Sequence, residues 1–290
     1  MKRLAVVGVG TSHSSDFVSL INGIGREPIG SARVVIAFDE DESKAQEFAD
    51  RYGIERAVTD ISDIMGEVDG ALVLYPSIGL AHNHVKYARL LLEQGIPTFA
   101  DKPLADNYAD AASVLDLARS TGTPFMSCSA LRYAVELEEL VKKLGGADEL
   151  RGGSFRGPGH LVDYGIHLVE AVHTAFGPGI DHVYCESDDD RDVGLISYGD
   201  GRRIAIHVLR DSQYQFHTVL YSRREWGQAT ISDPVFYARM LEAFLSTLES
   251  GKPAISYDWT EEVLATVFAL KLSAESRRAV DLGELKGRLL

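Results

Sequence analysis

The sequence contains few of the features that mark secreted, membrane or nucleic-acid-binding proteins. Only two of its 290 residues are cysteines, Cys128 and Cys185, and their isolation favours a reducing cytoplasm over a disulfide scaffold. No run of ~18 apolar residues could span a membrane. Lysine and arginine total 29 against 43 acidic residues, a net charge of −14, which would repel a phosphate backbone. We therefore expect no membrane and no nucleic-acid partner.

The remaining composition is that of an ordinary globular protein, with 45% hydrophobic and 25% charged residues. The length favours two domains of the usual ~100–200 residues. The chain opens with a charged start and a short apolar run that ends at Gly8. This run is too short for a signal peptide and predicts a first strand instead.

The first part of the chain alternates short apolar runs with helical patterns that end at glycine. The predicted strands are Arg3–Val7, Arg33–Phe38, Arg56–Val58, Gly70–Tyr75, Ile96–Ala100 and Pro124–Ala130. The predicted helices are Ser43–Tyr52, Ser62–Met65, His84–Gln94 and Asp106–Thr121. This alternation is typical of βαβ units in a parallel sheet. It predicts an N-terminal α/β domain with a parallel sheet over residues 1–128.

The second part changes to a two-residue period after a helical pattern at Ala134–Leu144. Its predicted strands are Glu149–Arg156, Val183–Glu186, Gly194–Tyr198, Arg203–Leu209 and Phe216–Ser222, followed by helices Val235–Glu249 and Thr260–Arg277. We predict a C-terminal α+β domain over residues 129–290 with an open, mostly antiparallel sheet. Ile204, Ile206 and Val208 alternate along one strand, and we expect this apolar face to pair with another copy in a homodimer or homotetramer.

A glycine turn follows the first strand and precedes a helical pattern, which is the context of a dinucleotide-binding turn. Gly8 would permit the tight turn and Gly10 would let the backbone approach a pyrophosphate, while the helix start at Thr11 and Ser12 would supply amide donors. His13 occupies the position of the third small residue. A simple tight turn is the alternative.

Asp39 ends the second predicted strand, where an acidic residue can accept hydrogen bonds from the adenosine ribose. The acidic residues of 40–42 would repel a 2′-phosphate, so NAD is preferred over NADP. A solvated acidic turn is the plain alternative.

Asp101, Lys102 and Pro103 lie where another buried strand is predicted to end. Ligands of open α/β sheets bind at this edge, and Lys102 could donate a proton or a hydrogen bond there.

Asp163 and His167 are four residues apart, so on a helix they would project from one face. The pair could transfer protons, because a carboxylate orients the imidazole and raises its basicity. With His160 they could instead hold a metal, as could His82 and His84, but no cysteine or third carboxylate supports this, and we assign none. A purely structural pair is the third interpretation.

These motifs occur in an order that resembles the glucose-fructose oxidoreductase / inositol dehydrogenase (Gfo/Idh/MocA) family over nearly the whole chain. The matching segments are Gly8-Val-Gly10, Tyr75-Pro76-Ser77 leading to His84, Asp101-Lys102-Pro103, Asp163-Tyr-Gly165-Ile-His167 and the helix Tyr237–Gly251. The family pattern has glutamate at position 101, a small residue at 13, and Thr and Asn at 75 and 77.

The resemblance implies a Rossmann domain beside an open-sheet domain, with the substrate between them. It implies that Lys102, Asp163 and His167 act on the reacting hydroxyl and that His160 and Tyr164 help to bind the substrate. It adds Tyr75, Pro76, His84, Asp101 and Lys102 to the residues expected to hold the cofactor.

The expected function is NAD(P)-dependent hydride transfer between nicotinamide and a hydroxyl of a sugar, cyclitol or related polyol. His167 would remove the hydroxyl proton, Lys102 would stabilise the oxyanion, and Asp163 would tune His167. The alternatives are an NAD-dependent glycosidase that oxidises its substrate transiently and a non-catalytic nucleotide-sensing regulator. Specificity is expected from the loops Ser77–His82 and Gly157–His160 and from the sheet face with His207, Arg210 and His217.

Overall fold

The chain forms two compact units in the computed structural model, which describes residues 1–77, 81–232 and 235–287. The first unit contains Met1–Asp106, Asp110–Cys128 and Tyr237–Tyr257, and the second contains the remaining described residues. Asn107–Ala109 group with the second unit, and the later segment Tyr237–Tyr257 returns to the first. None of the described helices is both long and apolar enough to cross a membrane.

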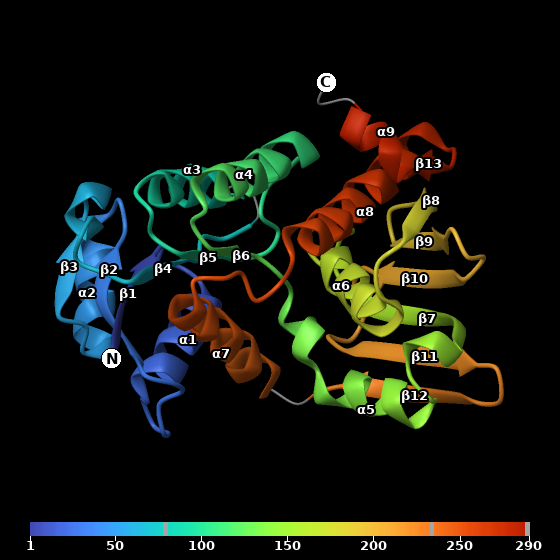
Figure 1. Ribbon diagram of the computed structural model, residues 1–290, viewed down its shortest axis with the longest axis horizontal. Coiled ribbons are helices and arrows are strands. Elements are labelled where there is room, and N and C mark those ends of the chain that lie inside the picture. The colour runs from blue at the N-terminus through green and yellow to red at the C-terminus, as the bar shows by residue number, and fades with distance from the viewer. Residues whose placement is uncertain (78–80, 233–234, 288–290) are drawn as a thin grey trace. The chain divides into compact units, whose positions relative to one another are not determined.

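The first unit is built on a six-stranded parallel sheet with the order β3-β2-β1-β4-β5-β6. The strands are β1 (Lys2–Val7), β2 (Ala32–Phe38), β3 (Arg56–Val58), β4 (Gly70–Val73), β5 (Thr98–Ala100) and β6 (Phe125–Met126). The connecting helices are α1 (Ser12–Asn22), α2 (Glu42–Tyr52), η1 (Ile61–Ile64), α3 (Ala81–Glu93) and α4 (Tyr108–Thr121). Figure 1 shows α3 and α4 on one face of this sheet and α1 and α7 on the other. The predicted Rossmann fold is confirmed.

Local signals explain most of these boundaries. Helix α2 begins at the N-cap Asp41, whose side chain accepts from the amides of the first turn, and ends at Gly53 in the left-handed conformation. Two differences from the predicted boundaries bear on the site. His84 lies inside α3 rather than at its start. The strand predicted at Pro124–Ala130 covers only Phe125–Met126, because Ser129 caps the 3-10 helix η2 (Ala130–Tyr133).

Helix α7 (Val235–Ser250) packs on the first unit, although its position in the chain had placed it in the second domain. Phe244 meets Phe99 of β5 with ring centroids 5.9 Å apart. A Leu248 methyl lies 2.8 Å from where a Cβ of Gly70 would stand, so the small residue in β4 lets the helix approach. In Figure 1 α7, in orange, lies beside α1, in blue.

The second unit contains a seven-stranded sheet with the order β12-β11-β7-β10-β9-β8-β13. Its strands are β7 (Leu150–Pro158), β8 (Ile180–Ser187), β9 (Arg191–Tyr198), β10 (Arg203–Leu209), β11 (Phe216–Ser222), β12 (Trp226–Ile231) and β13 (Val280–Asp281). β7 and β10 pair in parallel, whereas the other pairs of the described sheet are antiparallel. The mostly antiparallel sheet is confirmed, and β12 and β13 were not predicted.

Helices α5 (Val135–Lys143), α6 (Gly165–Phe176) and α8 (Tyr257–Ser276) accompany this sheet, with η3 (Ala147–Glu149) before β7 and α9 (Leu282–Gly287) near the end. Ile204, Ile206 and Val208 are fully buried within the chain. The expectation that this face pairs with another copy was wrong, because helices of the same chain cover it: Ile206 and Leu270 of α8 meet above Gly194.

The opposite face of the sheet is partly open. Leu195, Tyr221 and Trp226 are 41%, 48% and 63% exposed, respectively. Leu195 pairs with Ala205 across β9 and β10, and Tyr221 pairs with Trp226 across β11 and β12. These residues belong to the strand positions that alternate with the buried ones.

Candidate functional site

The two glycines of the turn after β1 have different surroundings. Gly8 has φ +89°, and a Cβ there would lie 2.7 Å from the Tyr75 ring. Its amide donates to the Phe38 carbonyl over 2.9 Å. A Cβ at Gly10 would meet no heavy atom within 4 Å. The fold therefore requires Gly8, whereas Gly10 faces open space in which a ligand can approach the backbone.

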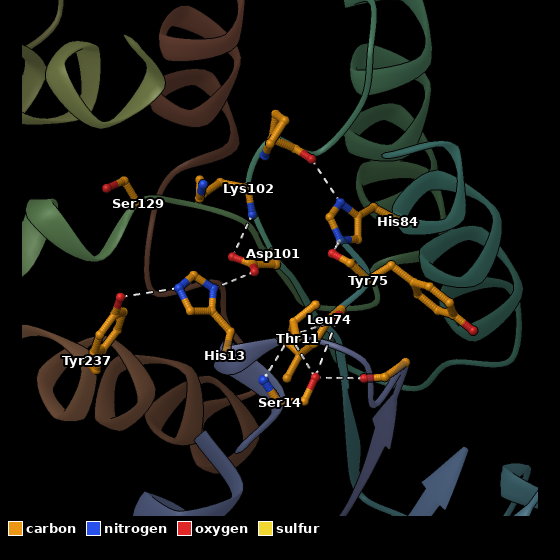
Figure 2. Close-up of polar contacts among 12 residues, drawn as sticks. Thr11, His13, Ser14, Leu74, Tyr75, His84, Asp101, Lys102, Ser129 and Tyr237 are labelled. Carbon is orange, nitrogen blue, oxygen red and sulfur yellow. Dashed lines mark hydrogen bonds and ion pairs between the residues drawn. The ribbon is translucent and has the colours of Figure 1, made fainter. Parts of the chain in front are cut away.

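Helix α1 begins directly after this turn and is fixed to the strand ends. Thr11 is its N-cap and accepts from the Ser14 amide over 3.0 Å, while the Thr11 hydroxyl donates to the Leu74 carbonyl over 3.2 Å. The buried Ser14 hydroxyl donates to the Gly8 carbonyl over 2.9 Å. These bonds hold the helix N-terminus, the favoured place for an anion, at the ends of β1 and β4 (Figure 2).

Asp39 lies at the carboxyl end of β2, as the sequence predicted, and it is buried. One carboxylate oxygen accepts from the Val9 amide over 3.2 Å and the other from the Asp41 amide over 3.1 Å. Neighbouring Glu40 accepts from Lys86 over 2.7 Å, and the bonds from Lys86 and Tyr87 hold the pKa of Glu40 below its ordinary value. Sequence analysis missed Lys86, a cation at this acidic edge.

His84 joins two loops of the first unit. Its ring is buried, with Nδ1 2.8 Å from the Pro103 carbonyl oxygen and Nε2 2.9 Å from the Tyr75 carbonyl oxygen. Carbonyl oxygens only accept, so both bonds form at once when both ring nitrogens carry protons. The ring thereby ties the segment after β4 to the Lys102–Pro103 turn, whose peptide bond is cis. Both nitrogens are engaged, so His84 has no free position for a metal.

Asp101 follows β5 and contacts His13, and both residues depart from the family pattern. Asp101 Oδ2 is 2.6 Å from His13 Nδ1, and Oδ1 accepts from the Lys102 amide over 2.8 Å. Burial favours the neutral acid, but the His13 charge and hydrogen bond hold the pKa of Asp101 well below its ordinary value. Burial lowers the pKa of His13, yet Asp101 outweighs it and the net shift is upward. The pair therefore joins a buried carboxylate to an imidazole whose charged form the carboxylate stabilises (Figure 2).

His167 lies in the first turn of α6 in the second unit. Its Nδ1 is 2.6 Å from the Ser129 hydroxyl, which also accepts from the Leu131 amide over 3.1 Å. Its ring packs edge-on against Phe216 with centroids 5.2 Å apart. When Nδ1–H donates to Ser129, Nε2 keeps the lone pair that a general base needs.

Asp163 does not lie on the helix that carries His167. Helix α6 begins at Gly165, and Asp163 is in the preceding turn, in which the Tyr164 amide donates to the His160 carbonyl over 2.8 Å. The helical spacing that predicted a shared face was therefore the wrong geometry. Tyr164 is at the end of this turn, and its ring lies 5.7 Å from that of His167.

His160 contacts Arg210, another residue named for specificity. Arg210 donates through Nε to His160 Nδ1 over 3.1 Å and through Nη2 to Asp192 over 3.0 Å. Both residues line a cavity of about 360 Å³ in the second unit. His207 and His217 are each paired with Arg156 in one row of the sheet. Of the loop Ser77–His82, residues 78–80 lie outside the described residues.

The helix that carries His167 is held by a buried ion pair. Glu170, one turn after His167, accepts from Arg132 Nε over 2.7 Å, and their side chains are 2% and 8% exposed. Within residues 1–77, 81–232 and 235–287, no three His, Cys, Asp or Glu side chains gather so as to hold a metal ion.

Sequence reasoning missed two residues that contact the predicted site. Ser129 is the penultimate residue of the strand predicted at Pro124–Ala130, so the strand-end argument used for Lys102 could have found it. Tyr237 reaches His13 Nε2 with its hydroxyl 3.2 Å away. No local signal could have found this contact, because 224 residues separate the two in the chain.

Comparisons with known proteins agree with this architecture. The family model described as "Oxidoreductase family, NAD-binding Rossmann fold" (GFO_IDH_MocA) matches residues 2–128. A putative UDP-kanosamine synthase oxidoreductase subunit of Amycolatopsis mediterranei is 30% identical over 61% of this chain, and the match spans about half, 52%, of that relative. Inositol 2-dehydrogenase 3 of Saccharopolyspora erythraea is 23% identical, covering 96% of this chain and 84% of that protein.

A solved structure shares the fold over almost the whole chain. Scyllo-inositol dehydrogenase from Lactobacillus casei, solved with bound NAD(H) and scyllo-inositol, has a TM-score of 0.83 at 14% identity. The alignment covers 98% of this chain and 99% of that one. The matched model identifies residues 2–128 as an NAD-binding Rossmann domain of the Gfo/Idh/MocA oxidoreductase family.

Proposed function

We propose that the protein is an NAD-dependent dehydrogenase that oxidises a secondary hydroxyl of a sugar, cyclitol or related polyol. The observation that carries the proposal is the glycine turn, in which an open Gly10 stands beside the carboxylate of Asp39 at the end of β2. The inositol dehydrogenases among the similar proteins support the polyol class.

The residues of the turn fit a dinucleotide. Open space at Gly10 lets a pyrophosphate reach the backbone, and α1 begins at Ser12, so its N-terminal amides favour the negative charge. Asp39 has carboxylate lone pairs beyond those that its two amide bonds use, so it could accept from ribose hydroxyls. When bound, NAD supplies the hydride acceptor.

The preference for NAD over NADP rests on charge. Asp39, Glu40 and Asp41 are acidic, and a 2′-phosphate carries further negative charge. Lys86 is the nearby cation, but its ammonium is bound to Glu40 at 2.7 Å. Lys86 would have to leave Glu40 before it could bind the 2′-phosphate of NADP.

We assign the chemical step to individual residues on the basis of the family pattern. His167 accepts the hydroxyl proton at Nε2, while Ser129 orients the ring through Nδ1. Lys102 stabilises the developing oxyanion, and Asp163, His160 and Tyr164 hold the substrate near the start of α6.

The test is a panel of inositols, sugars and other polyols with NAD and NADP in parallel, followed by the absorbance of reduced nicotinamide. His167→Ala should lower kcat by about 10²–10⁴-fold and leave NADH binding unchanged. The matched control is His182→Ala, which removes an exposed histidine paired with Asp181 at 2.9 Å and should leave turnover intact. Normal turnover of His167→Ala would refute the assignment.

We further propose that the open sheet face joins two copies of the chain. Leu195, Tyr221 and Trp226 expose large apolar side chains there, and exposed apolar patches favour association. Leu195→Glu should shift sedimentation toward the monomer. The control Ile24→Glu changes a residue of the first unit whose exposure matches that of Leu195, 40% against 41%. It should not shift the sedimentation. A monomeric wild type at micromolar concentration would contradict the proposal.

A further inference from the structure

His13 is held by three neighbours that fix its ring. Its plane stacks on Phe17 at 12° with centroids 5.1 Å apart, and the Tyr237 ring meets it edge-on at 5.4 Å. Its two nitrogens face Asp101 Oδ2 at 2.6 Å and the Tyr237 hydroxyl at 3.2 Å. A ring held by stacking and by both nitrogens has one orientation available.

Asp101 transmits this fixed orientation to the chain that follows it. Its Oδ2 contacts His13, and its Oδ1 accepts from the Lys102 amide at 2.8 Å. The carboxylate is almost fully buried, so removing the imidazolium would leave a buried charge without its partner. Figure 2 shows the continuous series Tyr237, His13, Asp101 and Lys102.

The departures from the family pattern at positions 13 and 101 compensate each other in this arrangement. Aspartate is one methylene shorter than glutamate, and the imidazole of His13 comes from the facing helix to contact it. Without His13, the buried carboxylate of Asp101 would lose the side chain that contacts it at 2.6 Å.

We propose that His13 and Tyr237 are positioning residues for Lys102, acting through the carboxylate of Asp101. Tyr237 orients the imidazolium, the imidazolium keeps Asp101 ionised and in place, and Asp101 fixes the Lys102 backbone. The chemical use of Lys102 rests on the proposed function, whereas the positioning does not.

The first test needs neither substrate nor cofactor. In the full chain, Lys102 is labelled by trace acetic anhydride, and its rate is read by mass spectrometry against the other lysines. Release of Lys102 from its fixed position should raise its acetylation rate. The increase should be largest in His13→Ala, smaller in His13→Asn, which keeps an N–H donor for Asp101, and smallest in Tyr237→Phe. The control His182→Ala breaks an exposed His–Asp pair and should not change the rate. An unchanged rate in His13→Ala overturns the proposal.

Two further readouts separate positioning from folding and from the proposed activity. The His13–Asp101 proton should give a strongly deshielded NMR resonance that disappears in Asp101→Asn and persists in His182→Ala, and urea unfolding reports whether each variant is folded. With a polyol substrate, His13→Asn should lower kcat by up to about 10²-fold with unchanged NADH affinity. Loss of NADH affinity with unchanged kcat would overturn positioning, whereas absence of wild-type turnover refutes only the proposed function.

Discussion

Alanine at Gly8 and at Gly10 should produce opposite phenotypes, although the two glycines are only two residues apart. Gly8 has φ +89° and its Cβ would lie 2.7 Å from the Tyr75 ring. The left-handed backbone costs a non-glycine residue about 1–2 kcal/mol and overpacking adds about 1–3 kcal/mol. Tyr75 cannot yield easily, because its ring stacks on Tyr87 at 5.3 Å. Gly8→Ala should therefore lose about 2–5 kcal/mol of unfolding free energy.

Gly10→Ala should leave the stability of the free protein unchanged. Its φ lies outside the left-handed region and the new methyl meets no atom within 4 Å, so the change should stay below about 0.5 kcal/mol. The methyl would, however, occupy the space proposed for the pyrophosphate. Overpacking of about 1–3 kcal/mol in the complex corresponds to roughly 5- to 140-fold weaker NADH binding.

The assay is urea unfolding followed by fluorescence, with calorimetric titration of NADH into each folded variant. Gly199→Ala is the matched control, because it also adds a methyl that meets nothing within 4 Å, but in the second unit, and it should affect neither quantity. Wild-type affinity in Gly10→Ala would refute the nucleotide-binding turn. Wild-type stability in Gly8→Ala would refute the steric reasoning.

Charged groups elsewhere give three further expectations. Glu170→Gln removes the carboxylate that accepts from the buried Arg132 guanidinium and should cost about 3–5 kcal/mol in urea unfolding. Unchanged stability would contradict a buried ion pair. The pKa of His13 is raised and that of Asp101 is lowered. The free energy of unfolding of the wild type should therefore exceed that of Asp101→Asn most between pH 3.8 and 6.5, and the excess should decline as pH rises through the pKa of His13. An excess that does not change with pH would refute the pair. Asp39→Asn should weaken NAD binding about tenfold, or ~1.4 kcal/mol. It should also lower the ratio of NAD affinity to NADP affinity measured by calorimetry.

The sequence predicted those parts of the fold that local chemistry determines. Strands Arg56–Val58, Arg203–Leu209 and Phe216–Ser222 have the predicted bounds, because their apolar periodicity and flanking turns lie within a few residues. The helix end at Tyr52 was also correct, since Gly53 alone supplies the left-handed cap.

Contacts between distant segments could not be predicted in this way. His13 and Asp101 were each seen as a separate departure, and their 2.6 Å contact joins positions 88 residues apart. The burial of Ile206 depends on Leu270 of a helix far along the chain. The Asp163–His167 spacing failed for a local reason, because it assumed a helix where a turn precedes α6.

The return of α7 to the first unit has a consequence for how the chain folds during synthesis. The first 128 residues do not complete this unit, because Tyr237–Tyr257 also belongs to it. A ribosome must therefore finish nearly all of the second sheet before Phe244 can cover Phe99. Until then, the nascent Rossmann sheet exposes an apolar face, which is a surface that chaperones bind. The segment that matches the family model therefore lacks one helix of the unit to which it belongs.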